Sequence, residues 1–197
     1  MELIDETDPR PVLSRATAFR GHVWDVVTEV VDLGAAGTVT RDFIDHPGAA
    51  AVVALDEHQR VVLVQQYRHP VGRLEWEIPA GLTDVEGEAP LSTAQRELAE
   101  EADLYASRWH RLLDVATTPG SSSETIAIFL ARDLRPVPAS ELHERDGEEL
   151  GMPRAFVPLD EVREAVLSGG LQNMTLAVAV LATCAARDAG WDSLSPA

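Results

Sequence analysis

The sequence of 197 residues predicts a mixed α/β fold in which strands and helices share one core. Segments rich in β-branched residues lie before and after a central helical segment, which starts at Ala89-Pro90 because proline suits a first helical turn. Two more helical segments, residues 160–168 and 173–189, follow near the C-terminus. Strands on both sides of a helix, followed by a helical end, indicate a sandwich of helices and sheet.

The first 46 residues are expected to form a small β subdomain. Residues 15–33 alternate loosely between apolar and polar side chains and predict two short strands joined near Gly21. Residues 34–37 predict a turn, and residues 38–45 a third strand. The remainder, residues 47–197, is expected to form the main domain.

The main domain begins with residues 52–55 and 61–66, which flank a polar turn and predict a hairpin. Residues 76–78 are expected to be extended before Pro79. The helix that follows places an apolar stripe opposite its glutamates. The stripe consists of Leu91, Ala94, Leu98 and Ala102.

Strands are predicted over residues 109–115 and 125–131, and a short last strand over residues 156–159. A polar, acidic loop over residues 136–151 separates the last two strands. Asp160 is expected to cap the next helix, and Ser168-Gly169-Gly170 to end it.

The formal net charge of −17 argues against nucleic acid and anionic membranes as partners, because both would repel the chain. An anionic substrate would meet the same repulsion unless metal ions or local arginines reverse the field at the site. The apolar content of 45% and the charged content of 25% are ordinary for a soluble globular protein.

Cys184 is the only cysteine, so no intrachain disulfide can form, and a reducing compartment, the cytoplasm, is expected. Cys184 itself is interpreted as a small core residue. Residues 1–10 lack the pattern of a signal peptide. The apolar run over residues 176–186 is too short to cross a bilayer.

Three glutamates of the central helix carry the strongest chemical signal. Glu97, Glu100 and Glu101 stand at i, i+3 and i+4, so their carboxylates converge on one side of the helix. Their mutual repulsion destabilises an isolated helix unless something compensates it. A hard divalent cation such as Mg²⁺ or Mn²⁺ would do so, whereas the plain alternative is a solvated acidic face.

The surroundings of these glutamates resemble the signature of the Nudix hydrolases. The similarity runs from Gly81 to Leu104 and includes Glu88 and the segment Arg96-Glu97-Leu98-Ala99-Glu100-Glu101. The sequence departs from that signature twice: six residues rather than five separate Gly81 from Glu88, and Asp103 stands where the signature has glycine. A loop tolerates one extra residue, and aspartate can end a helix in the left-handed conformation.

The resemblance implies an α/β/α sandwich with a mixed sheet and a metal-dependent hydrolase. By that resemblance Glu97 and Glu101 are the principal ligands of Mg²⁺ or Mn²⁺, with the backbone carbonyl of Ala80 as another ligand and Glu100 assisting. Glu88 is expected to brace the loop. Arg96 is expected to pair with a carboxylate of the signature and hold it in place.

Other segments resemble the ADP-ribose pyrophosphatase branch of the family. Arg68 and Arg41 correspond to arginines that reach the substrate's phosphates, a task suited to the planar guanidinium. Pro119 resembles a marker of the branch, although it could be an ordinary turn proline. Trp24 lies in the region that contributes to an adenine site, where it either stacks on the base or serves as a core or dimer contact.

In this branch the general base is a glutamate in a loop after the signature. Spacing back from Phe156-Val157-Pro158 favours Glu149, with Glu148 as the next choice. The resemblance implies hydrolysis of ADP-ribose to AMP and ribose 5-phosphate by a cytoplasmic homodimer whose N-terminal segment is exchanged between subunits. The alternatives are a Nudix enzyme that cleaves another nucleotide sugar or a dinucleotide, and a non-catalytic ADP-ribose sensor.

Other chemistries find no support. Four histidines show no shared metal-ligand spacing and are interpreted as surface or turn residues: His46, His58, His69 and His143. Ser121-Ser122-Ser123 lacks the flanking glycines of a nucleophile elbow. No Walker loop or dinucleotide fingerprint is present.

Overall fold

The computed structural model describes residues 3–145 and 151–197. The chain forms two compact units. One comprises Met1–Pro47 and Ala116–Glu124, and the other Gly48–Val115 and Thr125–Ala197. Each unit is described by itself.

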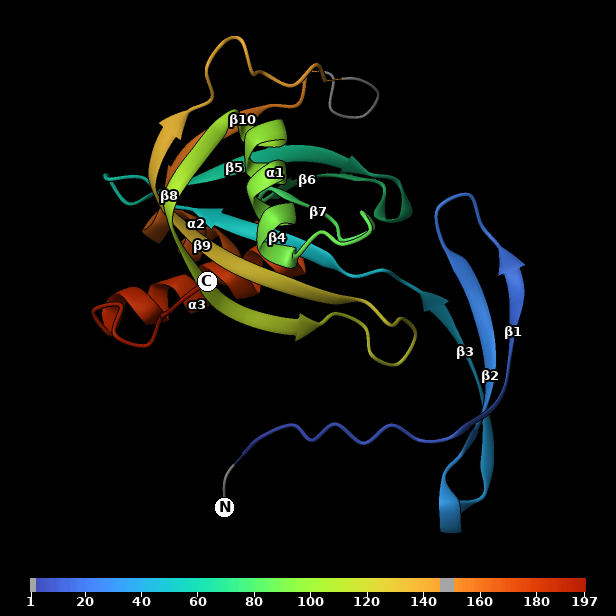
Figure 1. Ribbon diagram of the computed structural model, residues 1–197. Helices are drawn as coiled ribbons and strands as arrows, with labels where there is room; N and C mark the ends of the chain where they lie inside the picture. The colour runs from blue at the N-terminus through green and yellow to red at the C-terminus, as the bar shows by residue number, and fades with distance from the viewer. Residues whose placement is uncertain (1–2, 146–150) are drawn as a thin grey trace. The chain divides into compact units, whose positions relative to one another are not determined.

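The smaller unit is a three-stranded antiparallel sheet in the order β1-β2-β3 (Figure 1). Its strands are β1 Val12–Arg20, β2 Asp25–Asp32 and β3 Thr38–Asp45. Among its described residues only Val27 is buried, so the sheet has almost no core of its own. The segment 116–124 joins the end of β3, because the N–H of Ile44 donates to the carbonyl of Ser121 (3.0 Å) and the N–H of Ser123 donates to the carbonyl of Ile44 (3.0 Å).

The larger unit contains two sheets, in the orders β10-β5-β6 and β11-β8-β9-β4-β7. Strand β4 runs parallel to β9 and antiparallel to β7. The strands of this unit are β4 Ala49–Ala54, β5 Arg60–Arg68, β6 Arg73–Glu77, β7 Ala80–Leu82, β8 Leu104–Ala116, β9 Thr125–Pro136, β10 Arg154–Pro158 and β11 Ser195–Pro196.

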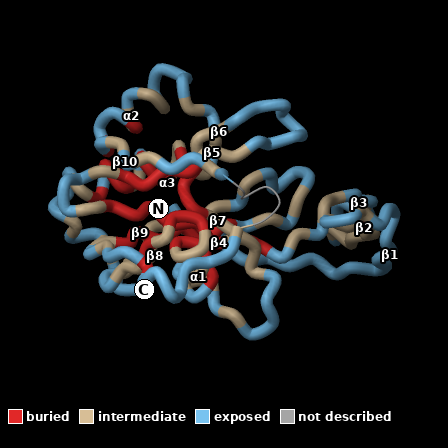
Figure 2. Tube along the Cα trace, turned by 90° about the horizontal axis from the view of Figure 1, so that it is seen from above, coloured by how far each residue is buried: buried red, intermediate tan, exposed pale blue. Residues whose placement is uncertain are grey.

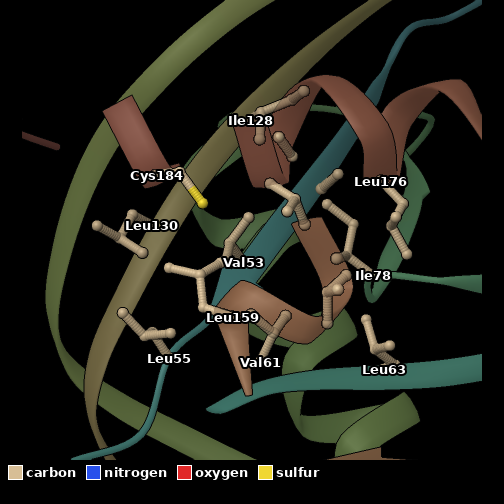
Figure 3. Close-up of a cluster of buried hydrophobic side chains, with 14 of the residues drawn as sticks. Val53, Leu55, Val61, Leu63, Ile78, Ile128, Leu130, Leu159, Leu176 and Cys184 are labelled. Atoms are coloured by element: carbon tan, nitrogen blue, oxygen red, sulfur yellow. The ribbon is translucent and has the colours of Figure 1, made fainter. Parts of the chain in front are cut away.

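Helices cover both faces of the sheet that contains β4. The helices are α1 Pro90–Ala102, α2 Leu159–Leu167 and α3 Met174–Asp188. Because side chains alternate along a strand, Val53 of β4 packs in one apolar cluster with Leu159 and Leu176 of α2 and α3 (Figure 3). Its neighbour Val52 packs in a second cluster with Leu98 of α1.

The buried parts of the chain therefore centre on β4, β9 and the inner face of α1 (Figure 2). The fold class predicted from the sequence, an α/β/α sandwich with a mixed sheet, is confirmed. The predicted apolar stripe of the central helix is also confirmed, because Ala94, Leu98 and Ala102 are buried and Leu91 packs against them.

The predicted hairpin over residues 52–66 is wrong in its pairing. The tight turn is present, with the N–H of Gln59 donating to the carbonyl of Asp56 at 3.1 Å. Beyond a single bridge between Leu55 and Val61, however, β4 and β5 enter different sheets. The turn therefore connects the two sheets instead of closing a two-stranded ribbon.

The predicted cap of the second helix is also wrong. The residue before α2 is Pro158, which makes no side-chain capping bond, and Asp160 lies inside the first turn. The Asp160 carboxylate instead accepts hydrogen bonds from Arg187 of α3 at 2.9 and 3.2 Å, which joins the two helices. Asn173 does cap α3, because its side chain accepts from the N–H of Leu176 at 3.0 Å.

Candidate active site

Two glutamates of α1, Glu97 and Glu101, lie against strand β7 and are buried. Glu97 is 8% exposed and Glu101 is 7% exposed. The Glu97 carboxylate lies so close to Gly81 that a Cβ atom there would stand 2.0 Å from Oε1 and 2.2 Å from Cδ. Any side chain at position 81 would therefore force the Glu97 carboxylate to move from where it lies. Two of the three carboxylates are therefore buried, and the alternative of a solvated acidic face is wrong for them.

Glu101 is held by the backbone of the same strand. Its Oε2 accepts a hydrogen bond from the N–H of Ala80 at 3.0 Å. Ala80 and Gly81 of β7 thus lie beside Glu101 and Glu97 of α1, so the predicted ligand positions are brought together within one unit. Glu100 lies about one helical turn after Glu97, on the outer side of α1, and is more exposed.

Arg96 connects the carboxylates of the helix to the loop before it. Its Nη1 donates to Glu97 Oε1 at 2.5 Å and to Glu100 Oε2 at 3.2 Å. Its Nε and Nη2 donate to the two oxygens of Glu88 at 3.2 and 3.0 Å. The Thr93 hydroxyl also donates to Glu88, at 2.9 Å. These bonds, that of Arg96 first, lower the pKa of Glu88 below its ordinary value, so it stays ionised.

The donor set suits a hard divalent cation. Four glutamates and one arginine leave a formal excess of three negative charges in a small, partly buried volume, and all the available donors are oxygens. Among residues 3–145 and 151–197, no three acidic, histidine or cysteine side chains already surround a common point. Glu97 is engaged by Arg96 and Glu101 by the N–H of Ala80, so a cation would have to compete with these hydrogen bonds.

Arg68 has a partner that the sequence analysis missed. Its Nε and Nη2 donate to Oε1 and Oε2 of Glu77 at 2.7 and 2.6 Å, a bidentate ion pair between β5 and β6. Glu77 is 5% exposed and Arg68 is about half exposed. Side chains alternate between the two faces of a strand, so the pattern Glu75-Trp76-Glu77 could have indicated that Glu77 lies on the same face of the sheet as Arg68 of the neighbouring strand.

The remaining predicted substrate residues belong to the smaller unit. Arg41 is an exposed residue of β3, and Pro119 lies in a turn closed by the N–H of Ser121 donating to the carbonyl of Thr118 at 2.8 Å. Trp24 lies against His46, with ring centroids 4.3 Å apart. The interpretation of His46 as a surface or turn residue is wrong as to its exposure, because its side chain is only 8% exposed and lies 3.3 Å from the Glu124 carboxylate.

The predicted bases, Glu148 and Glu149, lie outside the described residues. The segments on either side of them are described, and both contact Asp103 at the end of α1. Arg145 Nη2 donates to Asp103 Oδ1 at 2.7 Å, and Arg154 Nη1 donates to Asp103 Oδ2. Burial would raise the pKa of Asp103, but these two arginines lower it below its ordinary value, so the carboxylate is ionised.

A cavity of about 740 Å³ borders the outer side of α1. Arg96 and Glu100 belong to both the cavity and the carboxylate cluster, whereas Glu97 and Glu101 do not line the cavity. Two aromatic side chains of β8, Tyr105 and Trp109, also line the cavity. Space for an organic ligand therefore lies next to the acidic helix.

The geometry defines an α/β/α-sandwich protein with an oxygen-rich acidic site between a helix and a glycine-containing strand. Residues 45–175 match the family model described as the NUDIX domain, which spans well over half of the chain. The chain therefore belongs to the Nudix hydrolase family, whose members generally need divalent metal ions.

Relatives and a solved structure agree with this assignment. The chain is 41% identical to an ADP-ribose pyrophosphatase of Mycobacterium tuberculosis, covering 86% of this chain and 81% of that protein. It is 35% identical to an ADP-ribose pyrophosphatase of Bacillus subtilis, covering 81% and 80%. A crystal structure of an ADP compounds hydrolase superposes with a TM-score of 0.75 at 22% identity, covering 95% and 99%, which shows a shared fold.

Proposed function

We propose that this Nudix hydrolase cleaves the diphosphate of ADP-ribose to AMP and ribose 5-phosphate with the help of Mg²⁺ or Mn²⁺. The observation that carries the proposal is the pairing of Glu97 with Gly81 and of Glu101 with Ala80. This pairing supports a cation site at which the phosphates of a nucleotide could also bind. The choice of ADP-ribose rests on the similarity to two ADP-ribose pyrophosphatases.

The residues around the site have distinct tasks in this proposal. Glu97 and Glu101 would hold the cation together with the carbonyl of Ala80, and Glu100 would assist. When bound, the cation neutralises the diphosphate and lowers the pKa of a bound water. Arg96 keeps Glu97 and Glu100 in place when no cation competes for them. Glu88, anchored by Arg96 and Thr93, keeps the loop before α1 attached to the helix.

The reaction itself is a hydrolysis. The oxygen of a water molecule bonds to one phosphorus, the bridging P–O–P bond breaks at that phosphorus, and the departing phosphate retains the bridging oxygen. The water proton passes to a general base, for which Glu149 is the first candidate and Glu148 the second. Arg68, Arg41, Trp24 and Pro119 are proposed to orient the phosphates and the adenosine.

The central test converts the carboxylate of one proposed ligand, Glu97 or Glu101, into an amide. E97Q and E101Q should lower kcat for ADP-ribose roughly 100-fold or more while circular dichroism stays that of the wild type, because an amide is a poorer cation ligand. E164Q is the matched control, since Glu164 is an exposed glutamate of α2. Mn²⁺ binding measured by calorimetry should weaken in parallel for E97Q and E101Q alone.

The outcomes separate the alternatives. Full activity of E97Q or E101Q would reject the ligand assignment. If a panel of nucleotide sugars and dinucleotides contained a compound cleaved far faster than ADP-ribose, the substrate assignment would fail while the enzyme class stood. Tight ADP-ribose binding without cation-dependent turnover would favour a sensor instead.

A homodimer in the cytoplasm completes the proposal. Apolar side chains of β1 are exposed, among them Val12, Leu13 and Phe19, and a second subunit would cover such a surface. The single cysteine suits a reducing compartment. A monomer mass in sedimentation equilibrium at micromolar concentration would rule out the dimer.

A further inference from the structure

Asp103 ends α1 in an unusual way. It adopts the left-handed conformation, with φ 55° and ψ 38°, and its N–H donates back to the carbonyl of Ala99 at 3.2 Å. Glycine enters this conformation without a steric cost, whereas a side chain must overcome one. Glycine is also what the Nudix signature has here. Some interaction of the Asp103 side chain should therefore offset the steric cost of aspartate at this position.

The Asp103 carboxylate makes interactions that can offset this cost. Asp103 binds two arginines that lie 42 and 51 residues further along the chain, one at each oxygen. Arg145 also donates to the backbone carbonyl of Glu100 at 2.6 Å. The side chains of Asp103 and Arg145 are each 20% exposed, so the charge-assisted hydrogen bond between them is sheltered from solvent. Glycine could not make the two bonds of the Asp103 carboxylate.

The two arginines have a particular place in the sequence. Arg145 directly precedes, and Arg154 closely follows, the acidic segment that contains Glu148 and Glu149. Arg154 is also the first residue of β10, which pairs with Val64 of β5. One carboxylate thus connects the end of α1, two residues after Glu101, to the chain on both sides of that segment.

We propose that Asp103 is a positioning residue for the hydrolysis: through Arg145 and Arg154 it fixes both ends of the acidic segment relative to Glu100 and Glu101. The catalytic part of this inference rests on the proposed function. A group that delivers or accepts a proton must be held within hydrogen-bond reach of its target. Small displacements of such a group lower the rate more than they lower substrate binding.

The experiment separates the backbone of residue 103 from its carboxylate. D103G removes the carboxylate but suits the left-handed conformation, so the helix end should be kept. D103N keeps a side chain that tolerates this conformation but removes the charge. Both variants should lower kcat for ADP-ribose about tenfold or more, with KM and Mn²⁺ affinity within about twofold of the wild type. D114N, which breaks the exposed ion pair with Arg111, is the control and should leave kcat unchanged.

Coupling to the arginines provides a second measurement. If Asp103 acts through Arg154, the double variant D103N/R154Q should be no slower than the slower single variant, since both remove the same link. Fully additive losses would show that the two residues act independently and would overturn the inference. A kcat for D103G equal to that of the wild type would overturn it as well.

Proteolysis tests the anchor without any substrate. The chain contains no lysine, so trypsin can cut only after arginines. Cleavage after Arg145 requires its guanidinium to leave both Asp103 and the carbonyl of Glu100. D103G removes the first, charge-assisted contact, so it should raise the rate at that bond about tenfold, with cleavage after Arg20 as the internal reference. An unchanged rate would refute the anchor. If ADP-ribose is not hydrolysed by the wild type, the proposed function fails, and this rate still shows whether Asp103 holds the segment.

Discussion

Gly81 illustrates how one residue sets the position of a functional carboxylate. Its missing Cβ leaves room for the Glu97 side chain, which otherwise could not lie against β7. Glu97 is thereby brought next to the backbone that also binds Glu101. The spacing of the glutamates along α1 defines which side of the helix they occupy, but this glycine determines how deep they lie.

We expect G81A to displace Glu97 because the new methyl group would overlap its carboxylate. Mn²⁺ affinity and kcat should both fall, kcat roughly 100-fold, whereas the free energy of unfolding should change by only about 1 kcal/mol because the carboxylate can swing outward. G120A adds the same methyl group in open space and serves as the stability control. Unchanged Mn²⁺ affinity in G81A would contradict this account of Glu97.

The residues that could be predicted are those defined by local spacing. Glu97, Glu100 and Glu101 lie on one helix, so a period of 3.6 residues suffices to group them. The partners of Asp103 could not be found in this way, because Arg145 and Arg154 reach it only after distant segments pack together. The depth of Glu97 was missed for the same reason.

At the scale of elements, the short turn between β4 and β5 directs two neighbouring strands into different sheets. Asp56 organises it: its Oδ1 accepts from the N–H groups of His58 and Arg60 at 2.9 and 2.8 Å, and its Oδ2 accepts from the Arg60 guanidinium at 2.7 Å. Gln59 takes up the left-handed conformation that so tight a turn needs. The Asp56 side chain therefore stabilises this turn, although β4 and β5 form no regular ladder of hydrogen bonds with each other.

The turn makes stability depend on pH. Burial would raise the pKa of Asp56, but the hydrogen bonds from Arg60 and His58 lower it below its ordinary value. A lowered pKa in the folded state means that the stabilisation is present above the unfolded-state pKa of about 4 and is lost as the pH falls below it. D56N should therefore be less stable than the wild type by about 1 kcal/mol at pH 7, and the gap should narrow by pH 3. Urea unfolding at both pH values measures this, and a constant gap would contradict it.

Elements were predicted better than their pairing. The helix over Pro90–Ala102 and the strands of the smaller unit follow from local patterns. The separation of β4 from β5 cannot be predicted from local patterns. It depends on the pairing of β4 with β9 and of β5 with β10, and a short window of sequence does not show such long-range pairing.

At the scale of the whole molecule, charge is the dominant feature. A net charge of −17 is carried without a single lysine, so every positive side chain apart from histidine is an arginine. Arginine can bind two carboxylate oxygens at once, and Arg68, Arg96 and Arg187 all do so. Among the residues that the structure describes, no helix is long and apolar enough to cross a membrane.

This charge predicts that divalent cations stabilise the fold. A cation that binds the native site but not the unfolded chain adds about 2.7 kcal/mol when its concentration is 100 times its Kd. Mn²⁺ should therefore raise the midpoint of urea unfolding of the wild type, more than an equal ionic strength of sodium chloride does. E97Q and E101Q should show only the salt effect. A Mn²⁺ effect equal in all three proteins would indicate general screening instead of a specific site.

The single thiol of the chain has a practical consequence. Cys184 lies on α3 within the apolar cluster around Val53 and is 4% exposed (Figure 3), and burial raises its pKa. A thiol-modifying reagent can thus reach it only when α3 detaches from the sheet. The labelling rate of the unaltered protein consequently measures how often this face of the sandwich opens, with no need to introduce a probe.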